Sequence, residues 1–332
     1  FIGGNGGSSI VDRVDYGNDT PTALVRSNLD TNTEQFGTIG NTLYGYICGN
    51  AGSYSKVLRI DYSSDTTTAS TRGPLSTIRG NMGGASTSSY GWLGGGYQSG
   101  VTRSTVDRVD FSNDIVTAVE KGPLSSARGN GGGAGNNNYG WFTAGQTPSA
   151  YTSTVDRIDY SNDTGTASPK GPLNVNRAQH STTGNANYGY SGAGGSPGAI
   201  SSVERVDYGN DTITAVYKGP ISVTKTYPGA TGNSAFGYFG GGTPNGSTVD
   251  RIDYASDSTT TTKGPLSVAR YVLSAVSSQE DELEEKIFTN VAFGNNPIPT
   301  QPFGYVFGGS FPGSNPVKSD IYRIDYNNDT VT

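Results

Sequence analysis

The sequence has almost none of the residues on which many catalytic and metal sites depend. Its 332 residues include one cysteine, one histidine and one methionine. A single cysteine, Cys48, excludes an internal disulfide and leaves the redox compartment open. The lone histidine, His180, would need partners beside it that the rest of the sequence does not supply before it could form a hydrolase triad or a metal site. We therefore predict that the protein is not an enzyme and holds no metal or cofactor.

Charge and long apolar runs are also scarce. Charged residues make up 15% of the chain, the net charge is −6, and lysine and arginine form no cluster. This balance argues against binding to a phosphate backbone, so we predict no nucleic-acid partner. No run of 18 apolar residues is present, and the opening "FIGGNGG" has neither a charged signal-peptide region nor an initiator methionine. We expect a soluble chain without membrane insertion, trimmed from a longer one.

Glycine is the abundant residue, at 50 of 332 positions, and aromatic residues make up 10%. The aromatic content and the small net charge favour a folded chain over a disordered one. Long helices would need more alanine, leucine, glutamate and lysine than the sequence contains. The composition therefore predicts many short strands joined by tight turns.

One phrase, Arg-[Val/Ile/Leu]-Asp-[Tyr/Phe], occurs seven times, and its first six copies are spaced by 46–49 residues. Each copy is followed by a turn that ends in aspartate and preceded by a segment such as "YGWFTAG" at Tyr139. A period of this length with four short strand signals per unit is typical of a propeller blade. We interpret the arginines as repeated structural residues: Arg13, Arg59, Arg108, Arg157, Arg205, Arg251 and Arg323.

The repeat predicts an all-β fold: a seven-bladed β-propeller with four-stranded blades, the first and last of them incomplete. In each unit the inner strand follows the "GPLSxxR" segment, the second strand is the aromatic "YGWF" type, the third is "TVDRVDF" and the outer one is "TAVEKGPLS". We expect one domain over 1–332 and a preceding domain or partner that covers the open edges. The predicted repeats are 1–30, 31–79, 80–128, 129–177, 178–225, 226–270 and 271–332.

The blade pattern resembles the kelch type of β-propeller. That type has a glycine doublet ending the second strand, an aromatic-flanked third strand and a Pro-Leu segment before an arginine. The matching residues of one unit are Gly94, Gly95 and Gly96, Val106 to Phe111, and Gly122, Pro123, Leu124 and Arg128. The tryptophan that kelch blades usually carry on the outer strand is missing. The sequence pattern of the repeat is also similar to that of repeat arrays in virion proteins of marine bacteriophages.

The charged residues of the repeat have a structural interpretation. In "VDRVDY" the side chains alternate, so Arg108 and Asp110 share one face, and we expect them to satisfy each other or a backbone carbonyl of the next blade. In the "SND" turn, Asp110 and Asp114 flank Asn113 and offer oxygens of the kind that calcium binds. Asx hydrogen bonds that stabilise the turn are the favoured interpretation, and calcium binding stays open.

Two features fall outside the repeat and are candidates for binding. Aromatic residues of the variable glycine-rich loops are predicted to contact a ligand, and aromatic rings can stack on sugar rings. The four candidates are Tyr54, Tyr97, Tyr151 and Phe311. An insertion at about 277–299 contains "SSQEDELEEKIF", the one helix-like segment, which we expect on the opposite face as a docking element. Its candidate residues are Glu280, Asp281, Glu282, Glu284 and Phe288.

Fold alone does not give function, so the hypotheses come from different classes. We favour a non-catalytic interaction or structural propeller of an extracellular particle, a phage virion or tail-associated protein that takes part in host-surface recognition or assembly. Its partners would be other virion or surface proteins and a host glycan or receptor. The alternatives are a cytoplasmic kelch-type scaffold and a carbohydrate-active enzyme with a carboxylate pair near the axis.

Overall fold

The computed structural model describes residues 1–4, 8–30, 33–50, 54–244, 246–257 and 261–278, and the backbone of three further strands, β25 (Phe303–Phe307), β26 (Ile321–Asp325) and β27 (Thr330–Val331). The chain divides into two compact units, Phe1–Glu285 and Lys286–Thr332. The helices of the described residues are the short 3-10 turns η1 (Tyr62–Ser64), η2 (Tyr160–Asn162) and η3 (Tyr208–Asn210). No helix in these ranges is long and apolar enough to cross a membrane.

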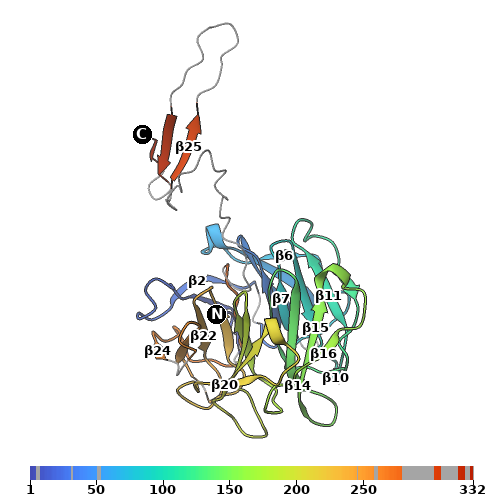
Figure 1. The fold of residues 1–332 in the computed structure, drawn as a ribbon. Coiled ribbons are helices and arrows are strands. Elements are labelled where there is room, and N and C mark those ends of the chain that lie inside the picture. Colours follow the sequence, from blue (N-terminus) through green and yellow to red (C-terminus); the bar gives the residue numbers. More distant parts are fainter. Residues whose placement is uncertain are drawn as a thin grey trace, which may run out of the picture. The chain divides into compact units, whose positions relative to one another are not determined.

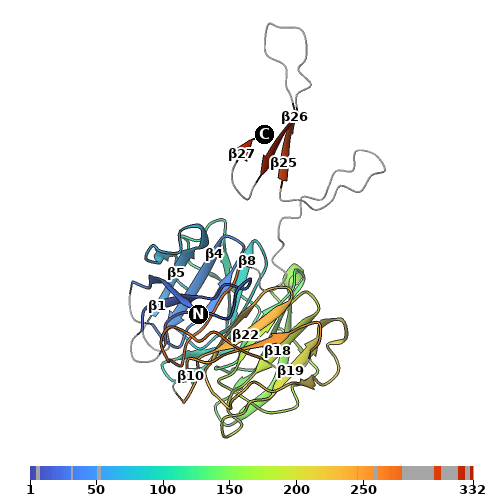
Figure 2. The ribbon, with the colours of Figure 1, turned by 90° about the vertical axis from the view of Figure 1, so that its left-hand side faces the viewer.

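Unit 1 is a β-propeller with five complete blades, each an antiparallel sheet of four strands (Figures 1 and 2). The all-β fold and the four-stranded blades are as the sequence predicts. Strands are given from the inner one outward. The first blade contains β3 (Gly37–Gly40), β4 (Tyr44–Asn50), β5 (Tyr54–Asp61) and β6 (Ser70–Arg72), and the second contains β7 (Gly83–Ser86), β8 (Tyr90–Gly94), β11 (Val106–Asp110) and β12 (Val119–Lys121). The third contains β13 (Gly132–Gly135), β14 (Tyr139–Gln146), β15 (Tyr151–Asp159) and β16 (Ser168–Lys170), the fourth β17 (Ser181–Gly184), β18 (Tyr188–Gly192), β19 (Val203–Asp207) and β20 (Val216–Lys218), and the fifth β21 (Gly229–Gly232), β22 (Phe236–Gly240), β23 (Val249–Asp253) and β24 (Thr261–Lys263). A small ribbon of β9 (Tyr97–Gln98) and β10 (Val101–Thr102) extends the second blade's loop.

The two ends of unit 1 meet between the fifth and first blades in what we call the closing sheet. It contains β1 (Ile10–Arg13), β2 (Leu24–Asn28) and two single positions, Ile2 and Ser274. Ile2 bridges Val11 on one side and Ser274 on the other. Ser274 in turn contacts the first blade through a hydrogen bond with Thr38, so the ring is joined by strands from both ends of the unit. The N-terminus accordingly lies near β2 and β22 (Figure 1).

The prediction of seven blades is wrong. Each of the seven copies of the arginine phrase forms a β-strand. Only the five copies from Arg59 to Arg251 belong to complete four-stranded blades. The first copy, with Arg13, forms the closing sheet together with a segment near Ser274. The last copy lies in unit 2, where β25, β26 and β27 form a three-stranded sheet. Its membership of one domain with the other copies stays a prediction.

Glycine allows the inner strands to pack closely around the axis. β3 lies beside β7, β7 beside β13, β13 beside β17 and β17 beside β21. A Cβ atom on Gly84 of β7 would lie 1.9 Å from the carbonyl oxygen of Thr38 in β3. No side chain fits at that distance, so the narrow centre of the ring explains the glycine-rich inner strands.

A girdle of backbone hydrogen bonds encircles the axis where the inner strands begin. Six residues with φ between 53° and 59° form this girdle, and neighbouring members are joined by backbone hydrogen bonds. They are Gln35, Asn81, Asn130, Gln179, Tyr227 and Val272. Along this series the amide of each residue from Asn81 to Val272 donates to the carbonyl of the one before, at 2.7–3.1 Å. The five girdle residues from Asn81 to Val272 lie two positions after the arginine or lysine of the "GPLSxxR" type, a relation that the sequence analysis missed.

Two layers of ion pairs hold the blades. The third-strand arginine of each blade pairs with the turn aspartate of the following one, as Arg108 does with Asp163 at 3.0 Å. Asp110, two residues after Arg108, instead accepts from the amide of Ser112 in its own turn. Deeper in the blade a second set of cations is buried against the third strand: Arg79 with Asp107, Arg128 with Asp156, Arg177 with Glu204, Lys225 with Asp250 and Arg270 with Asp12. Burial of charge at this density is tolerated because every cation has a carboxylate partner.

The glycine of the "KGP" segment makes a close contact between blades, which gives a first prediction. The amide of Gly122 donates to the carbonyl of Asp163, and a Cβ atom on Gly122 would lie 1.8 Å from the carbonyl oxygen of Gly165. We expect Gly122→Ala to lower the free energy of unfolding by about 1–3 kcal/mol, because two backbones must separate.

Gly165→Ala is the matched control, since a Cβ atom there would meet nothing within 4 Å. Its effect should be within about 0.5 kcal/mol, or slightly stabilising. Urea denaturation followed by tryptophan fluorescence measures both. Equal stability of the two variants would contradict a tight contact at Gly122.

Candidate functional site

A channel of about 110 Å³ runs along the axis, lined by residues of the inner strands. The six girdle residues line it at one mouth: Gln35, Asn81, Asn130, Gln179, Tyr227 and Val272. Small residues such as Gly84 and Gly133 line the interior. In the described part of the chain, no aspartate, glutamate, lysine or arginine lines the channel. The channel is thus a neutral, polar surface, and buried blade carboxylates such as Asp156 lie elsewhere, in ion pairs.

Tyrosines from two loops gather at the girdle mouth. Tyr97, in β9, donates its hydroxyl to the side-chain oxygen of Gln146 at 3.0 Å, and its ring lies where a Cβ atom on Gly129 would stand. Tyr151, at the start of β15, is close enough to interact electrostatically with Tyr97, and both interact with Tyr227. We call Tyr97, Tyr151 and Tyr227 the tyrosine cluster. All three residues are half-buried.

The local fold explains why these side chains converge. The loops between second and third strands leave each blade on the side where the inner strands begin. Gly129 and Gln146 form a β-bridge, and Gly80 and Tyr97 form the equivalent one in the blade before. These bridges fix the loop that carries Tyr97 against the girdle residue Asn130. The side-chain Nδ2 atom of Asn130 lies 3.5 Å from the Tyr97 hydroxyl.

Burial sets the chemistry of the cluster. It raises the pKa of Tyr97 and that of Tyr227 above the usual value, and the neighbouring phenol of Tyr151 acts in the same direction. Both hydroxyls therefore stay neutral and can donate or accept a hydrogen bond at neutral pH. Aromatic faces beside neutral amides, here of Asn130, Gln146 and Gln179, suit a polar uncharged ligand with flat apolar faces.

The structure places the four predicted loop residues differently. Tyr97 and Tyr151 come together, as members of the tyrosine cluster. Tyr54 begins β5 in the first blade with 54% of its surface exposed, and no contact among the described residues joins it to the cluster. Phe311 lies outside the described residues. The sequence analysis missed Tyr227 because this residue occupies a regular position of the repeat. It could have been found from the change of residue type, since other blades have asparagine or glutamine at that position.

The docking residues predicted in the insertion also lie outside the described residues, because none between Ser278 and Phe303 is described. These are Glu280, Asp281, Glu282, Glu284 and Phe288. Their role, and the helix expected around them, stay predictions.

The aspartates of the "SND" turn are engaged by protein groups. Asp110 accepts from the backbone and hydroxyl of Ser112, which is the Asx geometry favoured by the sequence. Asp114 accepts from the Tyr46 hydroxyl at 2.9 Å and from Arg59 at 2.8 Å. Among the described residues, no three histidine, cysteine or acidic side chains are grouped so that they could hold a metal ion.

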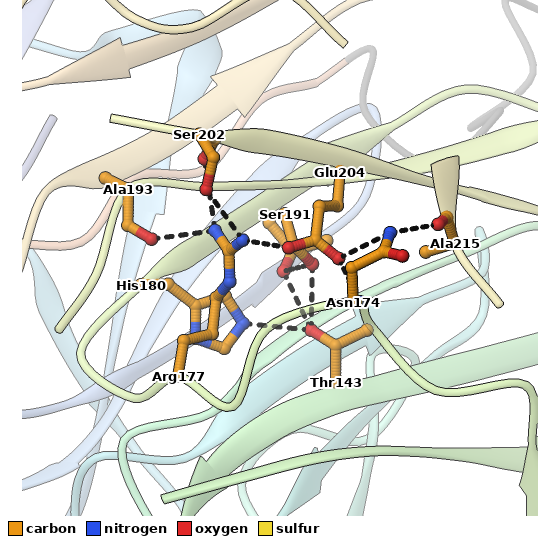
Figure 3. A network of polar contacts seen from close by, with 10 residues as sticks. Thr143, Asn174, Arg177, His180, Ser191, Ala193, Ser202, Glu204 and Ala215 are labelled. Carbon is orange, nitrogen blue, oxygen red and sulfur yellow. Dashed lines mark hydrogen bonds and ion pairs between the residues drawn. The ribbon is translucent and has the colours of Figure 1, made fainter. Parts of the chain in front are cut away.

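His180 belongs to a buried polar network between the third and fourth blades (Figure 3). Its Nε2 atom lies 3.0 Å from the hydroxyl of Thr143, which is also hydrogen-bonded to Ser191. Above it, Arg177 is paired with Glu204 and donates to the carbonyl of Ala193. Burial, followed by the charge of Arg177, lowers the pKa of His180 to about 3. The imidazole is therefore a neutral packing group.

Cys48, in β4, is buried in an apolar cluster with Val57 and Leu93. Burial raises the pKa of its thiol, so it stays protonated and unreactive. No known protein-family model matches the chain, and a search of curated proteins gives no match. The functional argument therefore starts from the geometry of the channel mouth.

Proposed function

We propose that the protein is a non-catalytic recognition propeller that binds a neutral glycan at the tyrosine cluster. The observation that carries this proposal is the convergence of Tyr97, Tyr151 and Tyr227 beside amide side chains at the mouth of an uncharged channel. A glycosidase would use a carboxylate pair, but no aspartate or glutamate lines the channel in the described part of the chain, and buried carboxylates such as Asp156 and Asp163 are paired with arginine. A rigid ring of blades holds the loops in place, so little ordering is needed when the ligand binds.

Within this proposal the blades are of the kelch type. β8 ends at Gly94, and the two glycines after it, Gly95 and Gly96, have φ values of 72° and 103°. The glycine run thus turns the chain sharply out of the sheet. Arg128, after the Pro-Leu segment, donates to the carbonyls of Phe142 and Ala144 in the second strand of the next blade. The φ values of these glycines and the contacts of Arg128 support the kelch resemblance.

We further propose that the propeller belongs to an extracellular particle, a phage virion or tail-associated protein that contacts the surface of a host cell. Supporting features are the Gly-, Ser-, Thr- and Asn-rich sequence, the scarcity of cysteine, methionine and histidine, and the resemblance in wording to phage repeat arrays. A host-surface polysaccharide is a ligand of the neutral, ring-containing kind that the tyrosine cluster suits.

The test is binding of the purified protein to a glycan array and to intact bacterial cells. We expect Tyr97→Ala and Tyr151→Ala each to weaken binding about tenfold, because each removes a ring face and a hydroxyl, together worth about 1.4 kcal/mol. Tyr217→Ala is the control, since Tyr217 is 52% exposed on the outer strand β20, in a different part of the blade. Glycan binding that survives both cluster changes, or that Tyr217→Ala abolishes equally, would contradict this site.

A further inference from the structure

Positive charges in the described part of the structure are paired with carboxylates almost without exception. Each lysine and arginine side chain that the structure describes forms an ion pair with an aspartate or glutamate, apart from Arg103. Arg103 comes between β10 and β11 of the second blade. A residue that breaks a rule followed by the rest of the fold is a candidate for function rather than for stability.

Arg103 is half-buried, so the lack of a counter-charge is unfavourable. Its Nε atom is enclosed and has no hydrogen-bond partner among the described residues. The Nε atoms of Arg205 and Arg251 are enclosed and unbonded too, but another guanidinium nitrogen of each is paired with an aspartate. Within the described ranges, Arg103 is therefore the cation whose counter-charge would have to come from outside the chain.

The blade architecture needs the backbone of this position and not its side chain. The carbonyl of Arg103 accepts from the amide of Arg128 at 3.1 Å, and the carbonyl of Thr152 accepts from the amide of Arg177 at the same distance in the next blade. The side chains differ, because the residues at the equivalent position of the other complete blades are Tyr54, Thr152, Ile200 and Gly246. A charge in a loop that the repeat does not require is better explained by binding than by packing.

Arg103 lies on the ribbon that carries Tyr97. Tyr97 of β9 pairs with Thr102 of β10, and at the next pair the Arg103 amide donates to the carbonyl of Gly96 at 2.9 Å. Neighbouring pairs of a ribbon are about 3.4 Å apart along the strands, so two linked sugars can reach from the Tyr97 ring to the Arg103 guanidinium. The Thr102 hydroxyl is also enclosed without a partner among the described residues, which makes it a second unsatisfied polar group on this ribbon.

Charges of opposite sign are separated along the third strands. Arg103 precedes β11, whereas Asp110 ends this strand and accepts from the backbone of Ser112. Asp159 has the same place at the end of β15 and accepts from Ser161. Aspartates of this kind stand at the turns, and Arg103 stands at the opposite end of the strand, among the loops. An acidic ligand at the loops therefore meets the positive charge without passing these carboxylates.

We propose that Arg103 forms an anion subsite beside the tyrosine cluster, which binds a carboxylate on the sugar next to the one that stacks on Tyr97. This inference rests on the proposed glycan binding and refines its ligand class: a neutral sugar at the tyrosine cluster is followed by a uronic acid. A guanidinium presents its N–H groups as a planar fork, which matches a carboxylate with two parallel hydrogen bonds. The cluster holds the neutral sugar, and Arg103 selects the charge of its neighbour.

Two probes that differ only in charge test the proposal. The first is an oligosaccharide in which N-acetylglucosamine alternates with glucuronate, and the second is the same oligosaccharide after reduction of its carboxylates to alcohols. Calorimetry measures the binding of each probe to the full chain. We expect the charged probe to bind about tenfold more tightly, because it gains a charge-assisted contact. The difference should shrink at high salt, because salt screens a contact that is open to solvent.

Protein variants locate the preference for charge. Arg103→Met should bind both probes with the affinity that the unchanged protein has for the reduced one, because the charge is removed and an unbranched side chain is kept. Arg13→Met is the control, since it changes the net charge equally at an arginine that is 48% exposed and lies at the end of β1. It should leave the tenfold difference unchanged. Tyr97→Ala should weaken both probes alike, because the ring contacts the neutral sugar that they share.

The outcomes separate the anion subsite from the tyrosine cluster, once thermal unfolding has verified that the three variants fold. If both probes bind equally to the unchanged protein while Tyr97→Ala weakens both, the subsite is overturned and the cluster stands. A preference that survives Arg103→Met, or that Arg13→Met removes as well, also overturns the subsite, as does absence of binding by either probe. If Arg103→Met removes the preference but Tyr97→Ala changes nothing, the subsite stands and the proposed role of the cluster fails.

Discussion

Replacement of Asp156 by alanine is expected to lower the free energy of unfolding by about 3–5 kcal/mol, because it leaves a buried guanidinium without its counter-charge. Asp156 accepts from Arg128 at 2.7 Å, and the two side chains are 0% and 3% exposed. Arg128 also donates to three backbone carbonyls, so its position is fixed and it cannot turn toward solvent. The same carboxylate accepts from the amide of Ser125, a contact that is lost with it.

Urea denaturation of Asp156→Ala beside the unchanged protein measures this loss. Lys56→Ala is the control, since Lys56 and Asp30 form a partly exposed pair whose removal should cost no more than about 1 kcal/mol. The double variant Arg128→Met with Asp156→Leu should recover much of the stability, because it removes both buried charges together. A loss for Asp156→Ala as small as that of Lys56→Ala would show that the buried pair is not the reason for the predicted effect.

The second large effect is a loss of stability in acid that depends on His180. The imidazole is enclosed by Thr143, Thr182 and Ser191, with Arg177 above it, and the pKa of His180 is lowered to about 3. Below pH 6.5 the unfolded chain binds a proton that the folded chain does not, so the unfolded state gains in stability as the pH falls. The contribution of neutral His180 is therefore fully present above pH 6.5 and is lost progressively down to about pH 3.

The size of this effect follows from the two pKa values. Between pH 6.5 and pH 4 the difference is 2.5 units, which corresponds to about 3 kcal/mol at ~1.4 kcal/mol per unit. Carboxylates also lose their stabilising contribution in acid, so the informative quantity is the difference from His180→Met, the residue that the second blade has as Met82. The free energies of unfolding of the two proteins should converge or cross as the pH falls from 7 to 4. Parallel pH profiles would contradict a neutral buried histidine.

Local pattern was enough to predict strands and their faces. The alternation in "VDRVDY" correctly placed Arg108 and Asp110 on one face of β11, and the spacing of the phrase gave four-stranded blades. The partner of Arg108 could not be predicted locally, because Asp163 is 55 positions away and is brought into reach by the stacking of blades. A count of phrases also could not give the number of blades, because it does not show which copies share one ring.

The same distinction applies to the candidate site, where local sequence revealed some residues and not others. Tyr97 and Tyr151 stood out because they interrupt a regular pattern in loops, and the structure brings both to the channel. Tyr227 did not stand out, since its importance comes from a backbone conformation, with φ at 53°, that places the ring at the mouth. The closing sheet depends on contacts between the two ends of unit 1, such as that of Ile2 with Ser274, for which the sequence has no local signal.

The closing sheet also determines when the ring can form during protein synthesis. Arg270 donates to the carbonyl of Phe1, 269 positions earlier, and the sheet that joins them needs both. At about 5–20 residues per second, the ribosome takes on the order of half a minute to make the intervening chain. Each complete blade is local and can form as it emerges. Phe1 and Ile2 can pair early with Asp12 and Val11, but Ile2 must wait for Ser274. During that time the other edge of Ile2 is open, and a strand from a neighbouring nascent chain can reach it first.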